Sequence, residues 1–293
     1  MTLPIHSNLP GVNEAMTRSR EAFQQYKKSK PAERFQLMAA IASELEGHAQ
    51  ELVDLAAKET FLDRSRLQTE LKRTCLQMLS YGQACAKGLS LDIRIQYADP
   101  GCQPPRQDLR KMRVPLGPVV VFGASNFPFA YSTAGGDTAC ALAAGCTVVV
   151  KAHPAHPNTS SRVAELINRA VLKSGWDPGI FIHMHGEGFA TGQALVMHPF
   201  TSAVAFTGSL EGGRALFDLA NQRAVPIPVF AEMGSVNPVF ILPGKLEQEM
   251  KSLTDMLAAS ITNSAGQFCT NPGLLIAIEN DSLKEFEKGL GIK

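Results

Sequence analysis

The stretch PLGPVVVFGASNFPFAYSTAGGDTACALAAGCTVVVKAHP, residues 115–154, decides the fold class of this chain. It holds two short apolar runs, residues 119–122 and 147–150, and each run ends at a polar or glycine-containing loop. Residues 132–144 lie between them and have the composition of a helix. Continuously apolar strands that alternate with helices indicate a parallel sheet covered on both faces, so we predict an α/β fold.

The same alternation extends in both directions along the chain. Further strands are predicted at residues 180–183, 203–206, 229–231 and 236–242, with helices at 160–173, 188–197 and 211–221. Upstream, the pattern predicts helices at 13–28, 31–60 and 66–86, followed by a β-hairpin arm at 91–113; downstream, it predicts a helix at 247–263 and a strand at 274–278. We expect a first unit at residues 1–231 and the start of a second α/β unit at 232–293.

Composition excludes several classes of partner. The net charge of +1 gives no electrostatic reason to expect nucleic acid or an anionic membrane surface. The N-terminus lacks the pattern of a signal peptide, and no uncharged apolar run approaches the length of a membrane span. The six scattered cysteines predict a reducing, cytoplasmic location, and Cys140 and Cys146 lie in an apolar run typical of a buried core.

Two strand-end loops carry polar side chains that could face a ligand, because parallel sheets bind ligands at the carboxyl ends of their strands. Asn126 in GASNFPF offers an amide donor, although an Asn in a loop is more often a turn former. Lys151 ends an otherwise apolar strand. That lysine suits a nucleotide ribose, or it marks the point where the strand reaches solvent.

Two more loops complete the candidate set. In TGSLEGG, Ser209 suits the N-cap of a helix whose free amides could face a pyrophosphate, although many helices begin this way. Glu232 stands between apolar residues and a glycine, which predicts a partly buried carboxylate that could act as a general base. Cys269 lies in the polar loop AGQFCTNPG, where a thiol could be either a nucleophile or inert.

Four histidines are candidate metal ligands. The alternation in FIHMHGEG places His183 and His185 on one face of a strand, and His153 and His156 lie in another loop. No cysteine or carboxylate cluster joins them to complete a zinc site, so structural histidines are the better interpretation and no metal is expected.

Taken together and in this order, five stretches resemble the aldehyde dehydrogenase superfamily: PLGPVVVFGASNFPF, ALAAGCTVVVKAHP, VAFTGSLEGG, FAEMGSVNPVF and NSAGQFCTNPG. The resemblance implies a parallel Rossmann-type cofactor sheet plus a second catalytic domain, and oxidation of a small-molecule aldehyde. Within the superfamily, the sequence looks most like the branch that oxidises α-ketoglutaric semialdehyde (2,5-dioxopentanoate). Some fatty aldehyde dehydrogenases look similar, so a fatty or other aldehyde remains an alternative.

The resemblance also implies a role for each candidate residue. Cys269 matches the nucleophile, Asn126 the side-chain donor to the oxyanion, and Glu232 the base that activates water. For the cofactor, the matching residues are Lys151 at the adenosine ribose, Gly208 and Ser209 at the pyrophosphate, and Gly234 at the nicotinamide side.

The cofactor preference follows from one departure from the family pattern. Many NAD-preferring members carry a glutamate three residues after the lysine, and here Pro154 occupies that position. Without that carboxylate a 2′-phosphate meets no repulsion, and Lys151 could attract it. We therefore expect NADP as cofactor, with NAD possible.

Family members continue well past the nucleophile, so the resemblance implies a C-terminally truncated chain in which residues 232–293 form an incomplete catalytic domain. A homo-oligomer is expected for a full-length form. Two other functions stay open: a non-catalytic remnant that binds nucleotide, and a thiol acyltransferase that uses Cys269 without a cofactor. The acyltransferase would not require Lys151 or the TGSLEGG turn.

Overall fold

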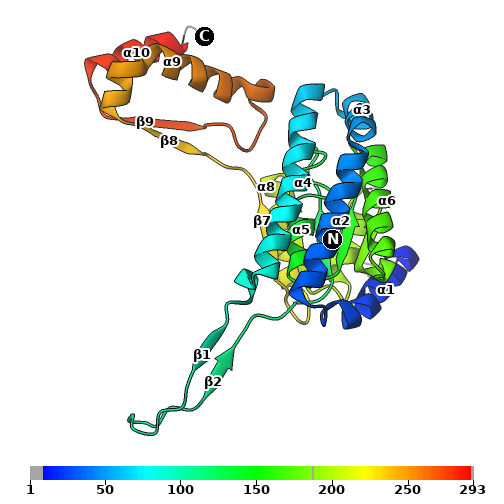
Figure 1. The fold of residues 1–293 in the computed structure, drawn as a ribbon. Helices are drawn as coiled ribbons and strands as arrows, with labels where there is room; N and C mark the ends of the chain where they lie inside the picture. Colours follow the sequence, from blue (N-terminus) through cyan, green and yellow to red (C-terminus); the bar gives the residue numbers. More distant parts are fainter. Residues whose placement is uncertain (1–8, 187, 292–293) are drawn as a thin grey trace. The chain divides into compact units, whose positions relative to one another are not determined.

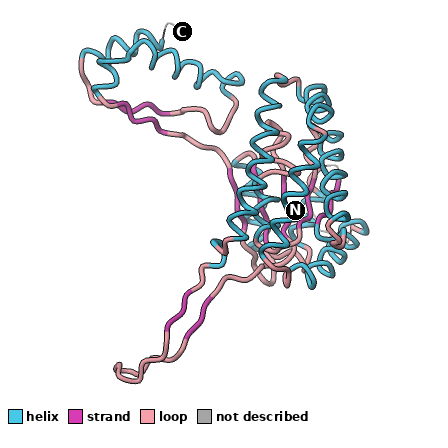
Figure 2. The backbone as a smooth tube through the Cα atoms, in the orientation of Figure 1, coloured by secondary structure: helices cyan, strands magenta, loops and turns pink. Residues whose placement is uncertain are grey.

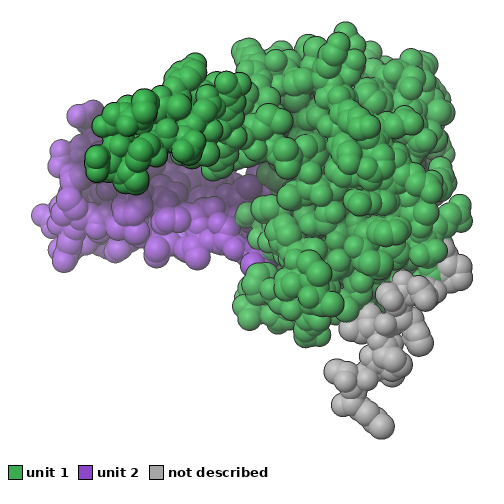
Figure 3. Space-filling view, turned by 90° about the horizontal axis from the view of Figure 1, so that it is seen from below, with its two compact units in different colours: residues 1–232 green, residues 233–293 purple. Residues whose placement is uncertain are grey.

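The computed structural model describes residues 9–186 and 188–291, which belong to two compact units, residues 1–232 and 233–293 (Figure 3). The first unit contains a five-stranded sheet in the order β5-β4-β3-β6-β7, and every neighbouring pair is parallel. Its strands are β3 (Val119–Phe122), β4 (Val148–Lys151), β5 (Phe181–Met184), β6 (Ala203–Thr207) and β7 (Val229–Glu232). The predicted parallel α/β sheet is confirmed.

Helices cover both faces of this sheet (Figure 1). Alternate residues of the central strands point to opposite faces, so Val119 and Val121 pack with the helices of one layer and Val120 with those of the other. The first layer contains α2 (Pro31–Gly47), α3 (Ala49–Thr60), α4 (Arg64–Ala86), α5 (Gly136–Ala143) and α6 (Pro157–Lys173). The second contains α1 (Pro10–Tyr26), α7 (Ala190–Met197) and α8 (Leu210–Asn221).

Two local predictions differ from the structure. The single helix expected at residues 31–60 is two helices, α2 and α3, because the backbone of His48 leaves the helical region (φ −116°, ψ 19°) and its Nδ1 lies 2.8 Å from the carbonyl oxygen of Glu44. Cys146 is buried as expected, but Cys140 is exposed, since α5 turns that side chain away from the core. All six cysteines are free thiols.

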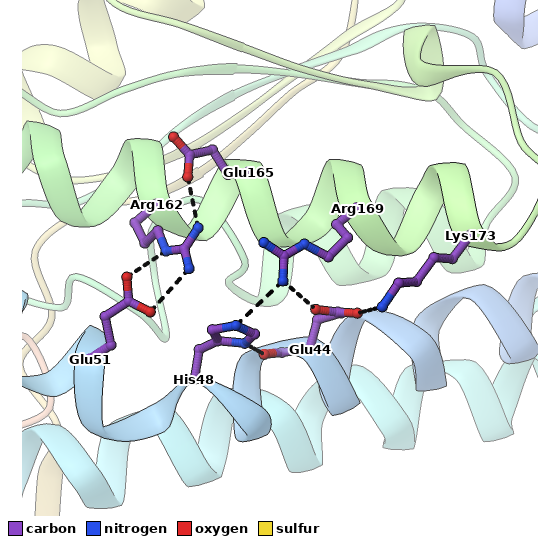
Figure 4. Close-up of polar contacts among 7 residues, drawn as sticks. All are labelled: Glu44, His48, Glu51, Arg162, Glu165, Arg169 and Lys173. Atoms are coloured by element: carbon purple, nitrogen blue, oxygen red, sulfur yellow. Dashed lines mark hydrogen bonds and ion pairs between the residues drawn. The ribbon is translucent and has the colours of Figure 1, made fainter.

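An ion-pair network joins α6 to α2 and α3 on the surface (Figure 4). Glu51 receives two hydrogen bonds from Arg162, at 2.7 and 3.0 Å, and Glu44 receives one from Lys173 at 2.6 Å. These hydrogen bonds hold the pKa of each glutamate below its usual value. Exposed pairs of this kind each contribute only about 1 kcal/mol or less, so the network supports the packing of the helices rather than a site.

Residues 94–111 include an antiparallel pair, β1 (Arg94–Gln96) and β2 (Leu109–Lys111), within the segment where the sequence predicts a hairpin (Figure 2). Ile95, Tyr97 and Leu109 on this hairpin expose about half or more of their surface: 52%, 73% and 59%. Among the described helices, none combines the length and the apolar character that crossing a membrane requires.

The second unit is a β-α-β-α arrangement. The parallel strands β8 (Pro238–Ile241) and β9 (Leu274–Ala277) are connected through α9 (Pro243–Thr262), and α10 (Asp281–Gly291) follows. Its core contains Ile241, Leu253 and Phe286. Alternation along the strands leaves Phe240 and Ile276 exposed on the other face. The final helix, α10, was not predicted from the sequence.

Candidate active site

The order of the strands locates a ligand edge in the first unit. From β3 the chain continues outward through β4 and β5 on one side, and then returns to β6 and β7 on the other. The connections from β3 and β6 therefore leave in opposite directions, and open α/β sheets bind ligands at the carboxyl ends of strands where this reversal occurs. The candidate residues 126, 151, 208, 209 and 232 all lie at or just after the ends of β3, β4, β6 and β7.

The loop after β3 carries Asn126 on a tightly held backbone. The amide of Ala124 donates to the Tyr131 carbonyl oxygen at 2.8 Å, which closes the loop. The ring of His156 lies 3.0 Å from the Ala124 carbonyl oxygen, so its Nε2 carries the donated proton. Gly123 is required here, because a Cβ on it would lie 2.9 Å from the Cα of Ser132. Asn126 itself is half-buried.

Lys151 is the last residue of β4 and pairs in register with Phe122. It is half-buried, and that burial lowers the pKa of its ammonium group. Within residues 9–186 and 188–291, no carboxylate lies within ion-pair distance of it. A partly desolvated cation at a ligand edge favours an anionic or hydroxyl-rich ligand.

The turn after β6 begins helix α8 as the sequence predicts. Ser209 is the N-cap, and its Oγ accepts a hydrogen bond from the Gly212 amide at 3.1 Å. A Cβ on Gly208 would lie 2.6 Å from the ring of Phe206, so a larger residue there would require that ring to shift. The N-terminus of α6 is different: the Glu59 carboxylate accepts hydrogen bonds from the amides of Asn158 and Thr159, both at 2.8 Å. This end of α6 is therefore already capped.

Glu232 is the last residue of β7 and pairs in register with Thr207 of β6. Its side chain is exposed, so the predicted partial burial is wrong: β7 is the edge strand of the sheet, and its alternate residues face solvent. A second carboxylate lies close by. Asp137, in the first turn of α5, accepts a hydrogen bond from Thr207 Oγ1 at 3.4 Å.

Asp137 was missed in the sequence, although a lone carboxylate in the small apolar helix GDTACALA was a usable signal. Burial raises the pKa of Asp137, the Thr207 hydroxyl opposes that shift, and the charge of Glu232 adds to it. The neutral carboxyl is therefore the form that the fold favours, and ionisation of Asp137 weakens the folded state.

Replacement of Asp137 by asparagine tests this effect. Because the folded-state pKa is raised, the stabilising contribution is complete below the unfolded pKa, near 3.8, and is lost as pH rises through the folded value. We expect Asp137→Asn to stabilise the protein at pH 7 by on the order of 1 kcal/mol, or roughly 2–4 °C in Tm. Thermal melts should show this advantage shrinking as the pH falls toward 4. An advantage of equal size at both pH values would contradict the assignment.

Cys269 and Gly234 belong to the second unit. The Nδ2 of Asn237 donates to the carbonyl oxygens of Cys269 at 2.6 Å and of Asn271 at 2.9 Å, so it holds the cysteine loop. Cys269 is half-buried. Just before it, Ser264 and Ala265 both have a positive φ, 50° and 55°. Such strained residues cluster at functional sites.

The role of Asn237 in holding the cysteine loop was not predicted from the sequence. Its position in the stretch FAEMGSVNPVF was the signal that could have pointed to it. Gly234 is exposed, and a Cβ on it would meet nothing within 4 Å.

The histidines make structural contacts. His183 and His185 each lie 2.7 Å from a serine hydroxyl on α6, those of Ser160 and Ser161. Burial, with a smaller effect of His185, lowers the pKa of His183 to about 4. Among the residues that the structure describes, no group of three or more His, Cys, Asp or Glu side chains could hold a metal ion.

The doubly covered parallel sheet and its ligand edge define an α/β protein of the dinucleotide-binding type. The sequence model of the aldehyde dehydrogenase family matches residues 6–291. The chain belongs to the NAD(P)-dependent aldehyde dehydrogenase family. This confirms the family expected from the five sequence stretches.

Two curated relatives and one solved structure show which aldehyde dehydrogenases this chain is similar to. α-Ketoglutaric semialdehyde dehydrogenase 2 of Azospirillum brasilense is 47% identical over 277 residues, which cover 94% of this chain and 53% of that protein. The α-ketoglutaric semialdehyde dehydrogenase of Acinetobacter baylyi is 43% identical and covers 97% and 54%. A crystal structure of an NAD-dependent benzaldehyde dehydrogenase from Corynebacterium glutamicum has the same fold, with a TM-score of 0.78, 24% identity and coverage of 95% and 57%. The chain thus spans about half the length of the curated relatives it matches.

Proposed function

We propose that this chain carries out the NADP-dependent oxidation of an aldehyde to a carboxylic acid, with 2,5-dioxopentanoate as substrate. The single observation that carries the proposal is the set of polar residues at the ends of β3, β4, β6 and β7, the ligand edge of a dinucleotide-type sheet. The similarity to two α-ketoglutaric semialdehyde dehydrogenases supports the choice of substrate.

In the proposed mechanism, the thiolate of Cys269 attacks the aldehyde carbon and forms a thiohemiacetal. Negative charge develops on the former aldehyde oxygen, where the Asn126 side-chain amide and the Cys269 backbone amide donate hydrogen bonds. The cysteine loop supports this role, because Asn237 fixes its backbone through two carbonyl groups.

The second half of the reaction releases the acid. A nicotinamide cofactor held by Lys151, Gly208 and Ser209 would supply a hydride acceptor, and loss of hydride from the former aldehyde carbon would leave a thioester on Cys269. Glu232 then takes a proton from water, and the resulting hydroxide attacks the thioester carbon and expels the thiolate. The sum is aldehyde plus water plus oxidised cofactor giving acid, reduced cofactor and a proton. The exposure of Glu232 leaves it accessible to water.

The residues at the sheet edge fit a dinucleotide. Lys151 is a partly desolvated cation with no carboxylate of the described chain beside it, which suits a phosphorylated ribose. Gly208 and Ser209 would hold the pyrophosphate at the start of α8, and Gly234 would lie at the nicotinamide side. Pro154 supplies no charge to repel a 2′-phosphate, which favours NADP over NAD.

The experiment that tests the proposal measures reduced-cofactor absorbance with 2,5-dioxopentanoate and a fatty aldehyde, each with NADP and with NAD. Turnover that is fastest with the semialdehyde and NADP supports the whole proposal, and strong exclusion of NADP would contradict the cofactor assignment. Isothermal titration with both cofactors separates binding from turnover. Cofactor binding without turnover would contradict the catalytic part of the proposal and would instead favour a non-catalytic nucleotide-binding function.

A homo-oligomer for a full-length form is part of the proposal. The exposed apolar side chains of the β1–β2 hairpin support it, because such surface is commonly covered by another chain.

A further inference from the structure

Helix α4 contacts the loop that carries Asn126 through two charged residues one turn apart. The Nη2 of Arg66 donates to the backbone carbonyl oxygen of Asn126 at 2.7 Å. Its guanidinium also lies over the ring of Phe127, 4.8 Å from the centroid. One residue of α4 therefore contacts both the candidate oxyanion donor and the residue that follows it.

Glu70 holds the far side of the same loop. Its Oε1 accepts hydrogen bonds from the amides of Phe129 at 2.8 Å and Ala130 at 2.9 Å. Only 4% of the Glu70 side chain is exposed, so the carboxylate replaces water as the partner of these amides. Its Oε2 lies 3.3 Å from Arg66 Nη2, within ion-pair distance, so the two opposite charges attract one another.

A buried ion pair is a costly way to stabilise a fold, because desolvation of two charges offsets most of their attraction. A buried pair that also binds three backbone groups of one loop has a more specific effect, since it restricts where that loop can lie. His156 restrains the loop from a third direction, through the Ala124 carbonyl oxygen. The loop is therefore held on either side of Asn126.

We propose that Arg66 and Glu70 are positioning residues that hold the Asn126 amide where the oxyanion forms. This inference rests on the proposed role of Asn126. Preorganised donors stabilise a transition state only when they are held in place before the reaction, and a displacement of about 1 Å can cost roughly 100-fold in rate. The pair acts through the backbone of the loop and does not contact the reacting atoms.

The test uses the whole chain with Arg66→Met, Arg66→Lys and Glu70→Gln. The matched control is Arg64→Met, on the same helix, where the arginine pairs with Asp54 instead of the loop. We expect Arg66→Met to lower kcat about 10- to 100-fold with little change in the KM for the aldehyde. Arg66→Lys should recover part of the loss, and Arg64→Met should leave kcat unchanged.

A double-mutant cycle separates positioning from general stabilisation. If Arg66 acts through Asn126, then Arg66→Met should cause almost no further loss in an Asn126→Ala background. An equal loss in both backgrounds would overturn the proposal.

Hydrogen exchange of the amides of Phe129 and Ala130 gives a second readout that needs no turnover. Glu70→Gln and Arg66→Met should accelerate this exchange and Arg64→Met should not. If the unmodified chain oxidises no aldehyde, the proposed function fails, and the exchange rates still decide whether the pair holds the loop. Unchanged exchange would refute the inference, whether or not the enzyme is active.

Discussion

Replacement of Cys269 by alanine is expected to lower the rate of aldehyde oxidation by about three orders of magnitude or more, because the proposed mechanism has no other group that can form the thioester. The rate of NADPH formation with 2,5-dioxopentanoate measures the loss. Binding of NADP should be retained, since Lys151, Gly208 and Ser209 all belong to the first unit.

The control for this variant is Cys102→Ala. Cys102 is also a free thiol of intermediate exposure, and its Sγ lies 2.9 Å from Asp99 in the hairpin. Its removal should leave the rate within about twofold of the parent, as is usual for a change away from a reacting centre. Full activity in Cys269→Ala, with a normal thermal melt, would mean that another residue is the nucleophile.

Replacement of Gly145 by alanine is expected to destabilise the first unit strongly. Gly145 follows α5 with φ 85°, a region that costs a residue with a Cβ about 1–2 kcal/mol. A Cβ there would also lie 2.5 Å from Cζ of Arg34. Arg34 is buried and donates to Ser29 Oγ at 2.8 Å and the Ala143 carbonyl oxygen at 3.3 Å, so it cannot move without breaking these bonds. Together, the backbone strain and the clash with Arg34 should lower the free energy of unfolding by about 3–5 kcal/mol, or Tm by on the order of 10 °C.

Gly175→Ala is the matched control for this prediction. Gly175 also follows a helix, α6, with φ 75°, but a Cβ on it would meet nothing within 4 Å. The free energy of unfolding of the Gly175→Ala variant should fall by only about 1–2 kcal/mol, the cost of a Cβ at a positive φ. The difference between the two variants in thermal or urea unfolding measures the contact with Arg34. Equal losses would show that Arg34 moves aside without cost.

The strands of the first unit could be predicted closely because they are short, apolar and bounded by polar loops. The turn between β6 and α8 was predicted equally well, since Ser209 forms the N-cap that its residue type favours. The break at His48 was missed although Gly47, a residue that disfavours the interior of a helix, directly precedes it. Glu232 was misjudged for a different reason: periodicity identifies a strand, but not whether that strand lies at the edge of the sheet.

The sequence by itself determined the parallel α/β class and the family, and it supplied the candidate residues for the proposed chemistry, because strand periodicity, loop chemistry and motif order are local properties of the chain. Only the tertiary structure decided which distant residues act on these sites. It brought Arg66 and Glu70 of α4 onto the loop of Asn126, some sixty positions away. It also brought Asp137 to Thr207, beside Glu232. Contacts of this kind depend on how helices pack across the sheet, and no local pattern specifies them.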